Sequence, residues 1–150
     1  MGWVVGQMVL IFVEGVVSYP AFDALPPRSP GGWLSMAGGA FLLVAGAWLV
    51  YRGVDALGGG LTPLPAPNES GELVRAGIYA RIRHPIYAGV IALAAGWAFF
   101  VVSPWALAVA ALLAVWLDLK ARREEAWLLE RYPEYAAYRR GTNRIVPGLY

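Results

Sequence analysis

Four apolar runs decide what this chain can fold into. They cover about residues 3–19, 33–52, 85–102 and 105–118. About twenty apolar residues in a helix cross the ~30 Å hydrocarbon core of a bilayer, and the two shorter runs need a slightly thinned bilayer or little tilt. The sequence therefore predicts an all-α integral membrane protein with four transmembrane helices, forming a single domain over residues 1–150. No basic residue precedes the first run, so we expect it to be retained rather than cleaved as a signal peptide.

The composition supports a membrane protein and excludes several other classes. Apolar residues make up 59% of the chain and charged residues only 15%, against about 25% charged residues in ordinary globular proteins. A net charge of +2 gives no reason to expect nucleic acid as a partner. The absence of cysteine excludes disulfides and thiolate catalysis, and one histidine without an acidic cluster gives no basis for a metal site.

The positions of the basic residues predict the orientation in the membrane. Of the twelve Lys and Arg residues, only Arg28 lies in the connector at 20–32, and the others lie in the 52–84 loop or from residue 120 onward. By the positive-inside rule we expect that loop and the C-terminal segment in the cytosol, and with four spans both termini are cytoplasmic.

The segments between and after the apolar runs differ in composition, and each predicts a different structure. The connector at 20–32 is rich in proline and glycine and is predicted to be non-helical, and residues 58–75 are predicted to form a long water-facing loop. After residue 118, charged and aromatic residues alternate, which predicts an amphipathic helical segment beneath the bundle with a break near Pro133.

A basic cluster stands directly before the third run. Arg81, Arg83 and His84 precede Pro85. A residue before proline is biased toward extended geometry, whereas proline fits the first position of a helix, so we predict that the chain arrives extended and begins a helix at Pro85. The free N–H groups of that helix and the cationic side chains together suit an anion. The alternative is that the basic residues only anchor the helix at the lipid headgroups.

Two adjacent carboxylates, Glu124 and Glu125, follow the fourth run. Adjacent residues point about 100° apart on a helix, so we expect that they do not both face one ligand directly. One could bind the hydroxyls or the amine of a ligand while the other pairs with a basic residue. The alternative is an ordinary surface ion pair, such as Lys120 with Glu124.

Small residues recur every four positions along the last two runs, and such spacing lets membrane helices approach closely. They are Ala88, Ala92 and Gly96 in the third run and Ala106, Ala110 and Ala114 in the fourth. We therefore predict a tightly packed helical hairpin over residues 85–117.

Glu14 is an acidic residue within the first run. An ionisable side chain inside a membrane span is a functional hypothesis by default. Its place toward the expected non-cytosolic end, away from the basic cluster, favours a structural role at the interface or in a polar pair. A small multidrug-type transporter, with four short spans and an acidic residue in the first, is the functional alternative.

Several motifs in the second half of the chain resemble one family of enzymes. They are the stretches at 73–79 (LVRAGIY), 83–89 (RHPIYAG), 124–128 (EEAWL) and 135–138 (YAAY), and the closing Pro147. Together they resemble the isoprenylcysteine carboxyl methyltransferase and phospholipid methyltransferase superfamily of integral membrane enzymes. The resemblance covers about residues 60–150, and the first two runs match only as hydrophobic helices.

The resemblance implies S-adenosylmethionine as methyl donor, bound at the cytosolic end of the helices, and a lipophilic acceptor that enters from the bilayer. It implies that the cofactor-binding residues are Tyr79, Arg83, His84, Pro85, Tyr87, Gly89, Glu124, Glu125, Leu128 and Tyr135. It implies that the residues acting on the reacting groups are Glu125, Arg140 and Arg144. Gly89 could instead serve helix packing, and the tyrosines could instead anchor the chain at the membrane interface.

The acceptor is open between two chemistries. A prenylcysteine-like carboxylate is the first expectation; it needs no base, and Arg140 or Arg144 would hold it. A phospholipid amine is the second, and because an amine has to lose a proton first, a Glu or His84 would take it. An NADPH-dependent reductase of the sterol type is a further alternative, since such reductases look similar in this region.

Overall fold

The computed structural model of the chain is all-helical. It describes residues 2–23, 25–57, 73–146 and 148, so most of the predicted loop at 58–75 and Pro147 lie outside the described residues. The helices are α1 (Gly2–Phe22), α2 (Pro30–Leu57), the short 3-10 helix η2 (Gly77–Ala80), α3 (Pro85–Phe100), α4 (Pro104–Arg131) and α5 (Tyr135–Arg140). Within the described residues there is no β-strand, and the one isolated β-bridge joins Ile82 to Asn143. The prediction of an all-α protein is confirmed.

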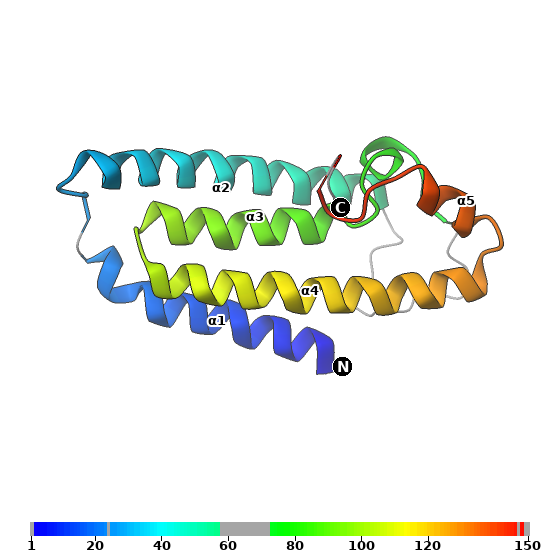
Figure 1. Ribbon diagram of the computed structural model, residues 1–150, viewed down its shortest axis with the longest axis horizontal. Coiled ribbons are helices and arrows are strands. Elements are labelled where there is room, and N and C mark those ends of the chain that lie inside the picture. Colours follow the sequence, from blue (N-terminus) through cyan, green and yellow to red (C-terminus); the bar gives the residue numbers. More distant parts are fainter. Residues whose placement is uncertain (1, 24, 58–72, 147, 149–150) are drawn as a thin grey trace.

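Four helices form an antiparallel bundle. Figure 1 shows α3 between α2 and α4, with α1 along the other side of α4. The turns after α1 and after α3 lie at one end of the bundle, and η2, α5 and the C-terminal segment lie at the other end, beside the N-terminus of α3. The segments that carry the basic and acidic motifs therefore gather at one end.

Three of the described helices, α1, α2 and α4, are long and apolar enough to cross a membrane. At 1.5 Å per residue, the 28 residues of α4 extend about 42 Å, whereas the 16 residues of α3 extend about 24 Å and fall short of a ~30 Å hydrocarbon core. Large apolar side chains on the outside of the bundle are exposed, such as Phe12, Phe41 and Trp105. These features are those of an integral membrane protein, with three candidate spans by length where the sequence predicts four.

The helix ends differ from the predicted ones around the first connector. α1 continues to Phe22 with Pro20 inside it, and α2 already begins at Pro30. The prediction that all of residues 20–32 is non-helical is therefore wrong. Pro20 lacks the N–H for one backbone hydrogen bond near the end of α1 without ending the helix there, and proline fits a first helical position well.

The predicted hairpin is formed by α3 and α4. Ser103 caps α4, because its hydroxyl accepts a hydrogen bond from the N–H of Ala106 at 3.2 Å. The buried cluster between the two helices consists of Ala94, Ala110, Leu113 and Leu117.

The closest backbone approach, however, is between α2 and α3. Glycines on α2 are buried at every seventh position: Gly32, Gly39, Gly46 and Gly53. A Cβ atom added to Gly39 would lie 2.6 Å from the carbonyl oxygen of Gly96, and one added to Gly46 would lie 2.8 Å from that of Gly89. No side chain fits there, so glycine on both helices is what allows this contact.

Glu14 and Ser18 are buried on one face of α1, at 5% and 1% exposure. The hydroxyl of Ser18 accepts a hydrogen bond from the indole N–H of Trp97 on α3 at 2.9 Å. Among the described residues, Oε1 of Glu14 has no hydrogen-bond partner. Glu14 therefore lies inside the bundle, and the polar contact of this face is made by Ser18.

α4 continues well past its apolar part. It ends at Arg131, and Pro133 separates it from α5, as predicted. We call residues 118–131 the polar extension of α4. In Figure 1 this extension runs beyond the N-terminus of α3, beneath η2 and α5. It thereby presents its acidic residues to the basic segment before α3.

Candidate functional site

The C-terminal segment, residues 135–146, returns to the stretch that leads into α3. We call this segment, which includes α5, the tail. The N–H of Arg83 donates to the carbonyl of Asn143 at 2.8 Å, and the N–H of His84 donates to the carbonyl of Arg144 at 3.0 Å. In the other direction, the N–H of Asn143 donates to the carbonyl of Arg81 at 3.1 Å. His84 is non-helical, with φ −125° and ψ 61°, and the helix begins at Pro85. The predicted helix start at Pro85 is confirmed, but the predicted extended geometry is not, because η2 precedes this segment and ψ of His84 lies outside the extended region. The tail lies alongside this approach to α3.

Glu125 is the centre of a buried ion cluster. It is 2% exposed, and its Oε1 accepts hydrogen bonds from Nε of Arg83 at 2.8 Å and Nε of Arg144 at 3.1 Å. Its Oε2 accepts from a second nitrogen of Arg144 at 3.2 Å, and Nε of Arg139 lies 3.5 Å away. Burial alone would raise the pKa of this carboxyl, but the contacts with the surrounding imidazole and guanidinium groups hold it well below its usual range. These contacts favour the ionised form of Glu125.

Arg83 also holds the tail in place. Its NH1 donates to the carbonyl oxygens of Arg139 and Thr142 and to the hydroxyl of Thr142. The hydroxyl of Tyr138 on α5 donates to the carbonyl of Tyr79 on η2 at 2.6 Å, and burial raises the pKa of Tyr138 to about 12. The segment before α3, the polar extension and the tail are therefore locked together.

His84 lies between the two adjacent carboxylates. Its Nδ1 is 3.6 Å from Oε2 of Glu124, and its Nε2 is 3.5 Å from Oε1 of Glu125. Each ring nitrogen therefore faces a different carboxylate, and the imidazole bridges Glu124 and Glu125. The expectation that the two carboxylates do not both face one bound ligand stays a prediction. The ring also stacks on Tyr87, with centroids 5.2 Å apart and planes 12° apart.

Glu124 has a different environment from Glu125. Its Oε1 accepts a hydrogen bond from the hydroxyl of Tyr87 at 2.6 Å. Burial raises the pKa of Glu124, and this hydrogen bond and the nearby positive charges offset the rise only in part. The pKa values of these two neighbouring carboxyl groups are thereby shifted in opposite directions.

Lys120 does not form the surface ion pair considered from the sequence. It is 4% exposed, and no ion pair among the described residues includes it. Its ammonium instead lies 4.9 Å from the centroid of the Tyr87 ring. This is within the range of a cation–π contact.

Three buried side-chain atoms have no hydrogen-bond partner in the part of the chain that the structure describes, and two of them belong to this end of the bundle. They are Nε2 of His84 and the hydroxyl of Tyr135, a residue that is 1% exposed. The 3.5 Å from Nε2 to Glu125 is longer than an ordinary N–H···O hydrogen bond. Buried polar atoms without partners are rare in native proteins, and a ligand is one explanation.

Most of the predicted site residues come together here. The structure gathers Arg83, His84, Pro85, Tyr87, Glu124, Glu125, Tyr135 and Arg144, with Tyr79 packed at their edge. Leu128 is half-buried one turn farther along α4.

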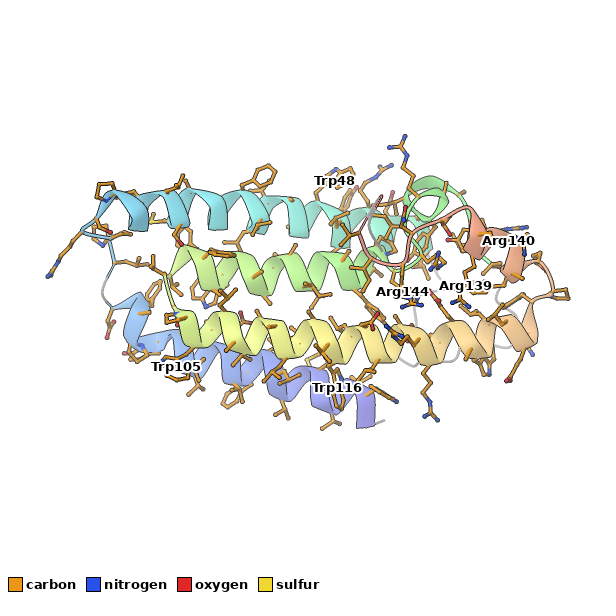
Figure 2. All side chains as sticks on the ribbon, in the orientation of Figure 1. Trp48, Trp105, Trp116, Arg139, Arg140 and Arg144 are labelled. Carbon is orange, nitrogen blue, oxygen red and sulfur yellow. The ribbon has the colours of Figure 1, made fainter. Side chains whose placement is uncertain are left out.

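Two predicted residues lie elsewhere. Gly89 faces α2, where an added Cβ would lie 2.7 Å from the carbonyl oxygen of Gly46, so it serves helix packing. Arg140 is exposed and forms no hydrogen bond or ion pair with any described residue. Figure 2 shows the side chains of Arg139 and Arg144 directed toward α4, with Arg140 farther from it.

Asp118, Arg139 and Thr142 also contact this cluster and were not predicted from the sequence. Asp118 accepts a hydrogen bond from NH1 of Arg144 at 3.2 Å. Its spacing of seven residues from Glu125 is two helical turns, which places both on one face, and that signal could have identified it. The contacts of Arg139 and Thr142 depend on the path of the tail, for which the sequence carries no comparable signal.

Comparison with known proteins gives one finding that agrees with this geometry. A family model described as phospholipid methyltransferase matches residues 34–135, which is more than half of the chain and includes the segment before α3, α3 and the whole of α4. A search of curated proteins finds no match to the chain. The resemblance inferred from the motifs is thus confirmed, and the chain belongs to the phospholipid methyltransferase family of membrane enzymes.

Proposed function

We propose that this protein transfers a methyl group from S-adenosylmethionine to the amine of a membrane phospholipid. The observation that carries the proposal is the contrast between two adjacent carboxylates: Glu125 accepts hydrogen bonds from the guanidinium groups of Arg83 and Arg144, whereas Glu124 accepts one from the hydroxyl of Tyr87. In keeping with these contacts, the pKa of Glu125 is shifted downward and that of Glu124 upward. Neighbouring titratable groups whose environments separate their pKa values are the usual mark of divided acid–base roles. Glu125 is the fixed anion that organises the guanidinium groups, and Glu124 is the group that exchanges a proton.

The residues at this end of the bundle fit S-adenosylmethionine. Nε2 of His84 and the hydroxyl of Tyr135 are buried polar atoms without partners among the described residues, and the donor offers a carboxylate, an ammonium, a ribose and an adenine to such atoms. The aromatic rings of Tyr87 and Tyr135 attract a cation such as a sulfonium. When bound, the cofactor supplies an electrophilic methyl group.

The arginines favour an amine over a carboxylate as acceptor. A carboxylate needs a cationic residue to hold it, and Arg140 and Arg144 were the expected candidates. Three nitrogens of Arg144 donate hydrogen bonds to Glu125 and Asp118. Arg140 is exposed and away from the cluster. An amine, in contrast, needs a proton acceptor, and the family model that matches is that of phospholipid methyltransferases.

Glu124 is the proposed proton acceptor. An alkylammonium must lose one proton before its nitrogen lone pair can attack a methyl group. In the proposed reaction the Glu124 carboxylate would take this proton, the amine nitrogen would form its new bond to the methyl group that the cofactor supplies, and a neutral thioether would be left over. The hydrogen bond of 2.6 Å from Tyr87 fixes the orientation of Glu124. Burial strengthens it as a base by raising its pKa.

The proposed orientation follows from the charges. We propose four membrane crossings, with the short α3 crossing beside α2 and α4 where the bilayer is locally thinner. Both chain termini and the proposed cofactor site are then on the cytoplasmic side, because all Lys and Arg residues except Arg28 lie at that end. This places the site where a soluble cofactor and the headgroup of a bilayer lipid can meet.

Two measurements test the proposal. Purified protein in mixed micelles is titrated with S-adenosylhomocysteine and with NADPH, and we expect it to bind the first alone. It is then incubated with the labelled methyl donor and a membrane lipid extract, and we expect the label on an amine lipid. Binding of the nicotinamide cofactor alone would reject the proposal. Label on a prenylcysteine-like carboxylate would mean that the acceptor is this carboxylate and not the amine of a phospholipid.

Glu124→Gln separates the two acceptor chemistries. We expect this variant to lose a factor of about 10² or more in turnover of an amine, the usual contribution of a general base. Its affinity for S-adenosylhomocysteine should change little, because the amide oxygen can still accept the Tyr87 hydrogen bond. Undiminished amine methylation by this variant would exclude Glu124 as the base.

A further inference from the structure

Lys120 is a buried cation that the proposed reaction does not use. It is the only lysine in the chain, and every other basic side chain apart from His84 is an arginine. It is 4% exposed, and none of the ion pairs in residues 2–23, 25–57, 73–146 and 148 includes it. Glu124, one turn farther along α4, interacts electrostatically with this ammonium but forms no ion pair with it, so burial of the ammonium still costs free energy. An anion from a bound ligand would remove that cost.

The position of Lys120 indicates which part of a ligand would meet it. One turn before it on α4, Leu117 is fully buried in the apolar cluster between α3 and α4. One turn after it, Glu124 accepts the hydrogen bond from Tyr87. Tyr87 packs against the apolar cluster with its ring and lies under the Lys120 ammonium. Lys120 therefore lies at the boundary between the apolar bundle and the charged site.

A phospholipid whose amine reaches Glu124 would bring its phosphodiester to this boundary. In an ethanolamine headgroup the phosphate and the nitrogen lie at the two ends of a two-carbon spacer. That span is comparable with the separation of about 5–6 Å between Cβ atoms one helical turn apart, as for Lys120 and Glu124. The compact ammonium of lysine suits a phosphate oxygen as a point charge, whereas the arginines here are engaged as forks with carboxylate and carbonyl groups.

We propose that Lys120 binds the phosphodiester of the acceptor lipid and makes the enzyme selective for amines that carry one. This inference rests on the proposed function and assigns the part of the same site that recognises the acceptor. Lys120 and Glu124 then fix the two ends of the headgroup, and the lipid chains remain in the bilayer beside the apolar part of α4. The amine is thereby positioned at its proton acceptor.

The test compares two acceptors and three variants in the full-length protein. The acceptors are phosphatidylethanolamine and a long-chain amino alcohol that has a primary amine but no phosphate. The variants are Lys120→Met, which keeps the length of the side chain without its charge, Lys120→Arg, and Arg123→Met. Arg123 is exposed on the same helix, so its substitution is a matched loss of one positive charge outside the site.

We expect Lys120→Met to lower kcat/KM at least tenfold for the phospholipid, mainly through KM, and less than twofold for the phosphate-free amine. Lys120→Arg should recover part of the loss, and Arg123→Met should leave both acceptors unaffected. Equal losses on both acceptors would overturn the proposal, because Lys120 would then act through Glu124 or through the fold. If Lys120→Met binds S-adenosylhomocysteine more weakly while the KM for the acceptor is unchanged, the proposal is also overturned. Lys120 would then bind an anionic group of the cofactor and not the phosphodiester of the acceptor.

A binding measurement keeps this inference separate from the proposed reaction. Both acceptors compete with a fluorescent phospholipid for the purified protein in neutral detergent micelles. If the wild-type protein prefers the phosphate-bearing lipid and Lys120→Met does not, the phosphodiester site stands even where no methyl transfer occurs and the proposed function fails. If both proteins bind the two acceptors alike, the inference fails while the proposed function can still hold.

Discussion

Glu125 neutralises guanidinium groups from three separate parts of the chain. Arg83 comes from the segment before α3, Arg139 from α5 and Arg144 from the residues that follow α5. Removing one partner of a buried ion pair costs about 3–5 kcal/mol, because the remaining charges stay buried without compensation. One carboxylate thus decides whether the charged end of the bundle is assembled.

The pH dependence of stability should report on Glu125. Its pKa is held below the usual value of about 4.3 for glutamate, so its stabilisation is present above that value and is lost as the pH falls through the lower pKa of the folded state. Glu125→Gln should therefore lower the thermal unfolding temperature by a constant amount between about pH 5 and pH 8. The difference from the wild type should shrink only below about pH 4.

The control for this measurement is Glu130→Gln, which changes an exposed carboxylate on the same helix. It should leave the unfolding temperature nearly unchanged across the pH range. A Glu125→Gln variant as stable as the wild type at neutral pH would show that the ion cluster does not hold this end of the bundle together.

At the scale of helices, the seven-residue glycine repeat of α2 determines how α3 is held. Gly46 and Gly89 oppose each other so closely that a Cβ on Gly46 would lie 2.8 Å from a carbonyl oxygen and 2.9 Å from the N of Leu93. Both of these atoms belong to the backbone of α3, so a side chain could be accommodated only if the two helices moved apart. Because α3 carries His84 and Tyr87 at its start, such a movement would also displace the site.

Gly46→Val should therefore disrupt the fold, whereas Gly38→Val should not. A side chain at Gly38 meets nothing within 4 Å, and both glycines lie in the interior of the same helix, so the intrinsic change in helix propensity is alike. We expect the first variant to lose about 1–3 kcal/mol or more through overpacking and the second to change little. Thermal unfolding in detergent and binding of S-adenosylhomocysteine measure the effect. Equal stability of the two variants would contradict the close packing of α2 on α3.

The sequence predicted the helices and the meeting of the two motif blocks, because both follow from local patterns. Apolar run lengths gave the four bundle helices, and Pro85 and Pro133 marked a helix start and a helix break. The α2–α3 contact was not predicted, because the glycines of α2 repeat every seven positions, whereas the small residues that predicted close packing recur every four positions on α3 and α4. The sequence also predicted Arg140 at the site, whereas the structure has Arg139 there. Two neighbouring residues of a short helix point in different directions, and which of them faces the ion cluster depends on how the helix packs.

At the scale of the whole molecule, the site exists only because the tail folds back. η2, α5 and the C-terminal segment cover the start of α3 and the polar extension of α4 at one end of the bundle (Figure 1). The bundle alone supplies Glu124, Glu125 and Tyr87, and the tail supplies Tyr135 and Arg144. A cofactor bound there would be enclosed between the helices and the tail.

This closure can be tested by a cross-link, since the chain has no cysteine of its own. Ile82 and Asn143 face each other in the parallel bridge, where Cα atoms are close enough for a disulfide. The double variant Ile82→Cys/Asn143→Cys should form an intramolecular disulfide under mild oxidant, seen as a mass loss of two hydrogens, and each single variant should not. The cross-link should leave binding of S-adenosylhomocysteine intact or slow its exchange, and a reductant should reverse that effect. A double variant that stays reduced would mean that the tail does not lie along the approach to α3, and the enclosed site would then have to be abandoned.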